Sequence, residues 1–587
     1  MVKRLAVIEK EKCNPVGCGN YLCIRVCPIN KTGEECIVKG SDNKPVINEE
    51  LCSGCGICSH RCPFGAIHII NLPDELSKEP IHRYGVNQFA LFSLPTPMFG
   101  KVVGILGRNG IGKSTAIKIL AGALKPNLGN LDREASYDEL IDYFKGTETQ
   151  KFFEELKKGK IKISYKPQQV DLIPKAHKGK TVKALLEKVD EKKKLKEIVK
   201  LLDLDNFLDT KVENISGGEL QRVAIAAAVL KDANLYIFDE PTSYLDIKQR
   251  IKVSKFIKSL ANEKTAVLVV EHDLIILDYI TDLCHIMYGK EDCYGVVSTP
   301  KATRVAINTY MEGFLKEENT RFRENRIKFD KMTKKKKVSN ILLTSWENID
   351  KKLGKFHLKA TKGDIFREEV IGVLGENGIG KTSFIKILAN EIKPDKGEIT
   401  EKVKVSYKPQ YLQSDSKEVV IDVLNEVVRK YTNQVINPLN IKPLYEKQLN
   451  HLSGGELQRV SIALCLGQDA DLFLLDEPSA YLDVEQRLIV SKIIADLMFQ
   501  TGKTAIVVDH DLLFIDYISN RLLVFDGKPA VSGEAKGPFE MEKGMNHFLK
   551  DLKITFRRDE ESNRPRVNKE ESVLDREQKS SGKYYYT

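Results

Sequence analysis

Apolar residues in this chain of 587 residues gather in short runs, and the same succession of runs occurs twice. The run Val102–Leu106 leads through a glycine-rich loop into the apolar segment Ala116–Leu120. The runs Val370–Leu374 and Phe384–Leu388 repeat this arrangement. A short apolar run followed by glycines and a periodic segment predicts a buried strand, a turn and a helix. The repetition predicts two copies of one α/β domain.

Each copy carries a phosphate-binding P-loop between its strand and its helix. The first reads Gly107-Arg-Asn-Gly-Ile-Gly112-Lys113-Ser114, and the second reads Gly375-Glu-Asn-Gly-Ile-Gly380-Lys381-Thr382. Backbone N–H groups of such a loop bind phosphates, the lysine reaches the outer phosphates, and the hydroxyl binds Mg²⁺. The predicted nucleotide contacts are Gly107, Asn109, Gly110, Gly112, Lys113, Ser114 and Thr115, then Gly375, Asn377, Gly378, Gly380, Lys381, Thr382 and Ser383.

Further motifs recur in the same order. The pairs are Gln168 and Gln410 after Tyr-Lys-Pro, the two Ser-Gly-Gly-Glu-Leu-Gln-Arg segments from Ser216 and Ser453, Asp239-Glu240 and Asp476-Glu477, Asp246 and Asp483, and His272 and His510. An aspartate at a strand end can hold the Mg²⁺ shell, and the next glutamate can polarise an attacking water. The glutamines can complete the metal shell, and the histidines can contact the terminal phosphate. Singly, Glu240 also fits a solvated loop acid and His272 a core histidine; the repeated order favours the catalytic interpretation.

Nine of the twelve cysteines precede residue 63. The run Cys52-x2-Cys55-x2-Cys58-x3-Cys62-Pro63 has the bacterial ferredoxin spacing, in which the fourth cysteine binds the other of two clusters. An earlier, looser run of four also ends in Cys-Pro. Exchange of the fourth ligands predicts two [4Fe-4S] clusters, one on Cys13, Cys18, Cys23 and Cys62 and the other on Cys27, Cys52, Cys55 and Cys58. Two four-cysteine zinc sites are the alternative, and Cys36 remains unassigned.

The repeated motifs resemble those of ATP-binding-cassette ATPases. The resemblance implies two cassettes that face each other head to tail and bind two ATP molecules between them, within one monomer. Each composite site would add the Ser-Gly-Gly signature of the opposite cassette. The first site would use Ser453, Gly454 and Gly455, and the second would use Ser216, Gly217 and Gly218. Asp246 and Asp483 would lie between the sites.

In that class an aromatic side chain upstream of the P-loop usually stacks on adenine. The candidates are Tyr84 or Phe92 in the first cassette, and Trp346 or Phe356 in the second. Each of them also suits a core position.

The spacing of the repeated motifs locates an insertion in the first cassette. Lys113 and Lys381 are 268 residues apart, whereas Gln168 and Gln410 are only 242 apart, so the first copy holds 26 more residues. This segment, within about 128–162, predicts two amphipathic helices, and Ser136-x-x-Glu139 predicts a capping box. Its charges nearly cancel, which favours docking on a surface; a neutral surface insertion is the alternative.

Composition adds one feature, a concentrated positive charge. The chain is 42% apolar and 30% charged, which indicates a globular protein and excludes a collagen-like or disordered one. No run approaches the 18–20 apolar residues of a membrane span, and the start is no secretory leader, so we expect a cytoplasmic protein. The net charge is +10, and residues 301–337 hold twelve Lys/Arg against five Asp/Glu.

That basic connector suits contact with a nucleic acid backbone. Within it, Arg321, Arg323, Arg326 and Lys328 alternate with Phe322 and Phe329, and Lys334–Lys337 follow. A solvated linker face is the alternative. Residues 553–587 predict a basic tail that includes Arg557, Arg558, Arg564 and Arg566.

Taken together, the chain resembles the E subfamily of ATP-binding-cassette proteins, the iron–sulfur twin-cassette family of RNase L inhibitor. The resemblance implies tandem P-loop α/β cassettes after a small α+β ferredoxin-like domain. The predicted boundaries are 1–75 for the iron–sulfur domain, 76–298 and 341–530 for the cassettes, 299–340 for the basic hinge, and 531–587 for the C-terminal hinge and tail.

The same resemblance implies an ATPase that splits ribosomes after termination or rescue and stays on the small subunit into initiation. Its expected partners are ribosomal RNA, a release factor or its rescue relative, and initiation factors. The insert and hinge would meet the small subunit. The alternatives are the ATPase pair of a transporter, which needs neither clusters nor a basic hinge, and an ATP-coupled electron-transfer protein.

Overall fold

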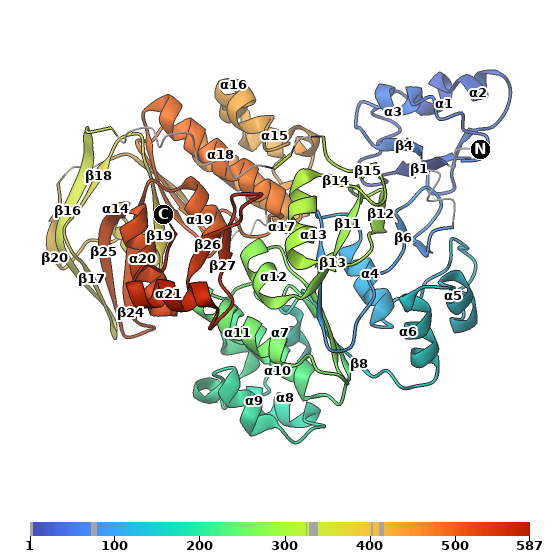
Figure 1. Ribbon diagram of the computed structural model, residues 1–587. Coiled ribbons are helices and arrows are strands. Elements are labelled where there is room, and N and C mark those ends of the chain that lie inside the picture. Colours follow the sequence, from blue (N-terminus) through green and yellow to red (C-terminus); the bar gives the residue numbers. More distant parts are fainter. Residues whose placement is uncertain are drawn as a thin grey trace.

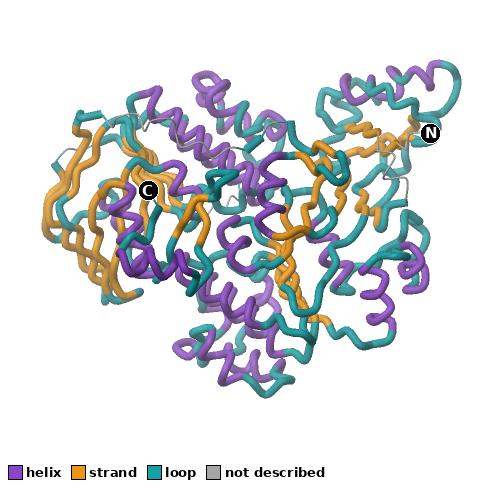
Figure 2. Tube along the Cα trace, in the orientation of Figure 1, coloured by secondary structure: helices purple, strands orange, loops and turns teal. Residues whose placement is uncertain are grey.

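The computed structural model describes residues 4–71, 79–324, 326–327, 339–400, 403–409 and 416–586. It has a small N-terminal unit followed by two α/β units, each built on its own sheet (Figures 1 and 2), so the predicted fold class is confirmed. Several predicted residues lie outside the described residues: Gln410, Lys328, Phe329 and Lys334–Lys337. Among the described helices, none is long and apolar enough to cross a membrane.

The N-terminal unit has short strands and helices packed around cysteines. Strand β1 (Arg4–Ile8) pairs antiparallel with β4 (Ile67–Asn71), and β2 (Ile37–Lys39) pairs with β3 (Pro45–Ile47). Its helices are α1 (Leu22–Val26), α2 (Pro28–Lys31) and α3 (Ile57–Arg61). Elements this short bury little apolar surface, so cross-links through metal suit a unit of this size.

The first cassette is built on a sheet of nine strands among the described residues. Its parallel core runs in the order β11 (Leu283–Lys290), β7 (Val102–Leu106), β10 (Ala266–Val270), β9 (Leu235–Asp239) and β8 (Ile163–Lys166). A mixed edge adds β5 (His82–Arg83), β6 (Ala90–Phe92), β12 (Tyr294–Val297) and β13 (Lys301–Ala302). Within it, β12 pairs parallel with β6, and the other pairings are antiparallel. The three central strands, β7, β9 and β10, are buried throughout, as expected for a parallel sheet covered on both faces.

The helices of the first cassette follow the predicted pattern. They are α4 (Lys113–Leu120), α7 (Leu172–Ala176), α8 (Val182–Val189), α9 (Leu195–Leu201), α10 (Gly217–Leu230), α11 (Ile247–Ser259), α12 (Leu274–Ile280) and α13 (Thr303–Glu312). The two insert helices are confirmed as α5 (Tyr137–Tyr143) and α6 (Glu148–Lys157), and Ser136 with Glu139 forms the predicted capping box. Phe144 stacks on Phe153 between them, so the insert has its own apolar contact. Figure 1 shows the two helices side by side.

The second cassette repeats this architecture on a sheet that has ten strands within the described part of the chain. Its parallel core is β24 (Arg521–Lys528), β19 (Val370–Leu374), β23 (Thr504–Val508), β22 (Leu472–Asp476) and β21 (Val405–Lys408). The edge holds β16 (Leu342–Leu353), β17 (Phe356–Ala360), β18 (Gly363–Phe366), β20 (Lys396–Ile399) and β25 (Ser532–Glu540). Its helices are α14 (Lys381–Leu388), α15 (Val420–Val423), α16 (Asn425–Tyr431), α17 (Gly454–Leu466), α18 (Val484–Thr501), α19 (Leu512–Ile518) and α20 (Met541–Leu552).

The cassette edges extend past the predicted boundaries. Strand β13 and helix α13 continue the first cassette to residue 312, and β25 with α20 continues the second to residue 552. These edge elements carry no motif, so the repeated motifs did not reveal them. The largest apolar cluster crosses between the cassettes, with α12 and α19 both contributing to it.

The predicted C-terminal tail is a folded clasp. Strands β26 (Phe556–Arg558) and β27 (Pro565–Val567) form a hairpin, and α21 (Val573–Ser581) follows. Arg564 is completely buried and pairs with Asp278 of α12 at 3.3 Å, and Arg566 pairs with the same carboxylate at 2.6 Å. Figure 1 shows the hairpin beside α12. These arginines hold the C-terminus to the first cassette, so they are not a free basic surface.

The basic hinge also uses its charge internally. Arg323 is buried, donates to the Tyr310 carbonyl at 2.7 Å, lies over the Tyr310 ring and pairs with Glu485 of the second cassette at 3.3 Å. The prediction that it contacts ribosomal RNA is therefore wrong, because its guanidinium faces protein. Arg321 and Arg326 are exposed.

We expect Asp278→Ala to loosen the C-terminal clasp. Removing the carboxylate leaves Arg564 buried and unpaired, which costs on the order of 3–5 kcal/mol. The melting temperature should fall, and limited proteolysis should release the segment after about residue 552. Lys255 also bridges to the clasp, through Glu570 at 2.9 Å, but both side chains are exposed. Lys255→Ala is thus the matched control and should change little; equal resistance of both variants would contradict the clasp.

Candidate nucleotide and iron–sulfur sites

Both P-loops lie where a central parallel strand ends and a helix begins. The loop after β7 leads into α4, and the loop after β19 leads into α14. Gly112 and Gly380 adopt φ of 86° and 91°, a conformation that side chains rarely take. A Cβ there would also approach Phe89 to 2.6 Å and Phe356 to 2.9 Å. The glycines therefore let the loop turn its N–H groups towards a phosphate.

The two P-loop lysines are buried at the centre of these loops. The Lys113 ammonium donates to the Gly107 carbonyl at 3.0 Å, and the Lys381 ammonium donates to the Gly375 carbonyl at 2.7 Å. Burial lowers the pKa of Lys113, and it lowers the pKa of Lys381 to about 8 against the opposing effect of Asp246 and Glu477. A nearby phosphate would favour the charged form of both amines.

Oxygen ligands suited to Mg²⁺ converge beside each lysine. In the second cassette the Thr382 hydroxyl donates to Asp476 at 3.0 Å. In the first, Ser114 begins α4, and Asp239 ends β9 as a buried carboxyl whose pKa burial and Glu240 raise to about 6. Hydroxyl and carboxylate oxygens are ligands that Mg²⁺ prefers, and a bound cation would hold Asp239 ionised.

The backbone of each candidate catalytic glutamate adopts a strained conformation that a hydrogen bond holds in place. Glu240 and Glu477 take φ of 45° and 47°, and such strained residues cluster at functional sites. The carbonyl of Glu240 accepts from Gln221 at 2.7 Å, and that of Glu477 accepts from Gln458 at 2.8 Å. Both glutamines are fully buried on the signature helices α10 and α17. They tie each signature helix to the glutamate of its own cassette.

Four functional side chains were missed by the sequence analysis, although all four lie within quoted motifs. Besides the two glutamines, Lys166 donates to the Asp239 carbonyl at 2.9 Å and Lys408 donates to the Asp476 carbonyl at 2.8 Å. Their recurrence at equal motif positions was the available signal. A buried polar side chain at a repeated position has to satisfy a local backbone group.

The surroundings of the two glutamates differ. Glu240 lies 3.4 Å from His272, accepts from Gln168 at 2.7 Å and from Ser243 at 3.1 Å. Burial acts to raise the pKa of Glu240, but His272, Lys113 and Ser243 together lower it to about 2.

In the second cassette Ala480 replaces Ser243, and Glu477 lies 3.6 Å from His510. His510 contacts the Asn377 side chain at 2.9 Å. Burial, Asp509 and Asp476 raise the pKa of Glu477 to about 7.

The cassettes meet head to tail as predicted. A buried carboxylate of each accepts from the P-loop backbone of the other: Asp483 from Asn109 N–H at 3.3 Å, and Asp246 from Asn377 N–H at 3.1 Å. The signature serines are exposed, and each accepts from its own helix, Ser216 from Glu219 N–H and Ser453 from Glu456 N–H. Among the described residues, neither serine forms a hydrogen bond to the opposite P-loop.

The structure separates the adenine candidates. Tyr84 is half exposed, and its hydroxyl lies 3.0 Å from the Thr115 hydroxyl at the start of α4, so its ring is available beside the first P-loop. Phe92 is buried in the core against Tyr294, so the prediction that it stacks on adenine is wrong. Trp346 is also fully buried, whereas Phe356 packs at the second P-loop.

Cysteines of the two runs lie beside one another in the N-terminal unit. Burial, with Cys13 and Cys18 nearby, raises the pKa of Cys23 to about 12, and Cys62 adjoins Cys13. Burial also raises the pKa of Cys58 to about 11, with Cys52, Cys55 and Cys27 as neighbours. The predicted exchange of fourth ligands requires Cys62 near Cys13 and Cys27 near Cys58, and both are so placed, although Cys23 also lies near Cys58. Crowded thiolates of this kind are stabilised by a metal.

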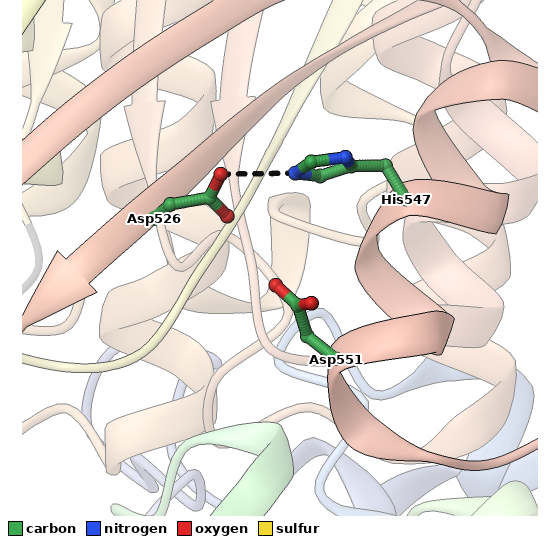
Figure 3. A group of neighbouring side chains, drawn as sticks. All are labelled: Asp526, His547 and Asp551. Atoms are coloured by element: carbon green, nitrogen blue, oxygen red, sulfur yellow. Dashed lines mark hydrogen bonds and ion pairs between the residues drawn. The ribbon is translucent and has the colours of Figure 1, made fainter.

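The spacing of the sulfurs favours clusters over zinc. Four thiolates on one zinc lie only about 3.8 Å apart, because each Zn–S bond is about 2.3 Å. Within the described residues, one set of three potential ligand atoms lies within 4.8 Å of one another, and it belongs to Asp526, His547 and Asp551. No three cysteine sulfurs in this part of the chain are therefore that close to one another. Figure 3 shows the hydrogen bond between Asp526 and His547. Asp526 also forms an ion pair with Lys536 at 2.9 Å. These contacts account for the group without a metal.

Cys36 lies beside the second group. It is buried and lines the same cavity as Cys27, Cys52, Cys55 and Cys58. Burial and its neighbours Cys27 and Cys52 raise its pKa to about 12, so it remains a thiol.

Comparisons with known proteins agree with this anatomy. Family models for the ABC transporter match residues 97–243 and 358–480, a 4Fe-4S binding domain matches 45–68, and a possible Fer4-like domain in RNase L inhibitor matches 4–35. The translation initiation factor RLI1 of Saccharomyces cerevisiae is 44% identical over 99% of this chain and 98% of its own length.

Two solved structures are similar over most of the chain. One is a model of ribosome-bound archaeal Pelota and ABCE1, with a TM-score of 0.95, 52% identity and full coverage of both chains. The other is a complex of the archaeal ribosomal stalk protein aP1 with the archaeal ribosome recycling factor aABCE1, with a TM-score of 0.83, 51% identity, and coverage of 88% of this chain and 100% of that one. The matched models indicate an ATPase that binds ATP with Mg²⁺ and carries 4Fe-4S clusters.

We expect Gln458→Ala to slow ATP hydrolysis while leaving ATP binding nearly unchanged. The substitution removes a hydrogen bond that fixes the strained backbone of Glu477, so kcat should fall about tenfold and KM should change less than twofold. Gln468 lies two residues after the end of the same helix and is exposed. Gln468→Ala is therefore the control, and equal kcat values for the two variants would refute a positioning role.

We expect about eight iron atoms and eight labile sulfides per chain, from two four-iron clusters. Cys27→Ser and Cys62→Ser should each remove about half of the iron, because each substitution removes the fourth ligand of one cluster. Cys36→Ser is the control and should retain all of it. Iron loss in the Cys36 variant alone, or zinc in place of iron, would contradict the ligand assignment.

Proposed function

We propose, because the chain belongs to the RNase L inhibitor or ABCE1 family of ATP-binding-cassette proteins, that it is an ATP-driven ribosome recycling factor. The observation that carries the proposal is the joining of a two-cluster unit to paired cassettes in one chain, together with full-length similarity to a ribosome-bound relative. The protein is an ATPase of the ABC type.

The proposed partners follow from the named relatives. One relative is bound to a ribosome together with Pelota, and another is a ribosome recycling factor complexed with a stalk protein. We infer that this chain splits ribosomes after termination or rescue, beside a release factor or its rescue relative. We also propose that it then remains on the small subunit into initiation; the yeast relative is named a translation initiation factor. It would act in the cytoplasm, as a monomer with two internal ATP sites.

The proposed chemistry places the same roles in both cassettes. Lys113 and Lys381 bind the outer phosphates, while Ser114, Thr382, Asp239, Asp476 and the two glutamines Gln168 and Gln410 hold Mg²⁺. Glu240 and Glu477 orient the attacking water, and His272 and His510 contact the terminal phosphate. Mg²⁺ supplies charge stabilisation at the phosphates when bound.

ATP would drive closure because each nucleotide binds better to the closed arrangement. The exposed serines Ser216 and Ser453 cap their own helices, whose N-termini can also bind phosphate. Closure of the cassettes would bring each serine to the nucleotide on the opposite P-loop. A ligand with higher affinity for one arrangement shifts the equilibrium towards it. Hydrolysis would then reopen the pair.

The iron–sulfur unit is attached firmly enough to transmit this movement. Asn87 of the first cassette is buried, accepts from Ile8 N–H at 2.9 Å and from Ile47 N–H at 2.7 Å, and donates to the Ala6 carbonyl at 3.1 Å. Arg83 donates to Glu49 at 2.9 Å beside it. Rotation of the first cassette would therefore carry the unit with it and push on a neighbouring factor.

The surfaces proposed to meet the small subunit are the insert and the exposed part of the hinge. The packed pair α5 and α6 projects from the first cassette in Figure 1. In the hinge, Arg321 and Arg326 are exposed and suit phosphate contact.

We expect the purified protein, with ATP and a release factor, to convert ribosomes into subunits on a sucrose gradient. The double variant Glu240→Gln and Glu477→Gln should instead stay with the small subunit, because it binds ATP without completing hydrolysis. The matched control, Lys113→Ala with Lys381→Ala, should neither split ribosomes nor be trapped. Intact ribosomes with the unaltered protein, together with no trapping of the glutamine variant, would overturn the proposal.

A further inference from the structure

Two ion pairs join the cassettes at equivalent positions, but their charges are exchanged. Arg108, in the first P-loop, donates to Glu485 of the second cassette through two bonds, one from Nε to Oε2 at 2.6 Å. Glu376 holds the same position in the second P-loop and accepts from Lys248 of the first cassette at 2.7 Å. Lys248 and Glu485 are themselves equivalent, since each lies two residues after the interface aspartate.

The equivalence of the two contacts is fixed by their surroundings. The residue after Arg108 is Asn109, whose N–H donates to Asp483, and the residue after Glu376 is Asn377, whose N–H donates to Asp246. The same backbone contact therefore sets the same register at both ends of the interface. Only the charged pair beside it changes sign.

Two charged contacts near the middle of the interface do not distinguish the cassettes. Arg250 pairs with Asp273 at 3.1 Å, and Arg487 pairs with Asp511 at 2.6 Å. The two aspartates are buried and the two arginines are partly buried. The four side chains meet between the cassettes, where burial and the nearby Asp511 raise the pKa of Asp273. Because both cassettes contribute the same Arg and Asp, two like cassettes would assemble the same cluster.

We infer that the exchanged pairs select the pairing of the two different cassettes and disfavour the pairing of like cassettes from two copies of the chain. Two first cassettes would place Arg108 opposite Lys248 at both ends of their interface. Two second cassettes would place Glu376 opposite Glu485. Like charges that face each other at these points destabilise both pairings of like cassettes. Such repulsion makes the interface specific for the pairing of the two different cassettes.

The first pair contributes more than the second. Arg108 and Glu485 form a two-bonded guanidinium–carboxylate pair with side chains 32% and 24% exposed, and the buried Arg323 adds a further contact to Glu485. Lys248 is 59% exposed and Glu376 is 32% exposed, so that pair is weaker and more sensitive to salt. Asp551, drawn in Figure 3, adds a favourable charge near Lys248.

The second pair gives the cleaner test, because Glu485 is shared with Arg323. The variants of the full chain are Lys248→Glu, Glu376→Lys and the double exchange Lys248→Glu with Glu376→Lys. The control Lys252→Glu reverses a charge on the same helix, at a lysine that pairs with Asp203 inside its own cassette. ATP hydrolysis reports intramolecular pairing, and sedimentation velocity with Mg²⁺ and a slowly hydrolysed ATP analogue reports pairing between copies.

We expect each single reversal to lower kcat/KM for ATP two- to tenfold at low salt and to produce dimers with the analogue. In each reversal the native contact becomes repulsive, while one like pairing becomes attractive. The double exchange restores the native attraction and should return kcat/KM to within twofold of the unaltered protein. The Lys252 variant should remain active and monomeric.

Recovery of kcat/KM in the double exchange would show that the single reversals act through charge and not through misfolding. Equal melting temperatures of all variants would show independently that each variant is folded. The difference between variants should shrink in 1 M salt, where the Debye length is about 3 Å. If single reversals stay fully active and monomeric, or if the double exchange does not recover, the inference is wrong. The test requires no ribosome, so its outcome is separate from that of the proposed function.

Discussion

The hydrogen bonds from each P-loop to the aspartate of the opposite cassette set the geometry on which the rest of the molecule depends. Asp246 and Asp483 are buried, and a buried carboxylate needs donors close by. Each obtains one from a backbone whose shape also forms a phosphate site. A change in the backbone of one P-loop therefore alters a hydrogen bond of the other cassette, so the two sites are structurally coupled.

Around this contact the chain uses its basic residues chiefly to hold itself together. Arg323 of the hinge and Arg564 and Arg566 of the clasp each reach a carboxylate on another element. Arginine suits these positions because its planar head satisfies several acceptors and stays charged when buried. The clasp binds the first cassette away from the P-loops, so it restrains the pair while leaving the nucleotide sites able to open. The iron–sulfur unit joins the same cassette through Asn87.

The two nucleotide sites are built alike but are not equivalent. Each signature helix fixes its own glutamate through a buried glutamine, and each glutamate has the same strained backbone. Ser243 contacts Glu240, however, whereas the second cassette has Ala480 there, and Asp509 faces Glu477 where Glu271 stands in the first. The repeated motifs thus give both nucleotide sites the same principal residues. Substitutions at neighbouring positions give the two catalytic glutamates different electrostatic surroundings.

The sequence alone determined the P-loops and the two insert helices, because each depends on residues close together in the chain or on exact repetition. It could not determine that Phe92 and Trp346 are core residues, that Arg323 is buried, or that the tail is a folded clasp. Those outcomes depend on partners far along the chain, such as Asp278 for Arg564 and Glu485 for Arg323. Whether an arginine faces solvent or protein is decided by which carboxylate the fold brings to it, and only the tertiary structure supplies that neighbour.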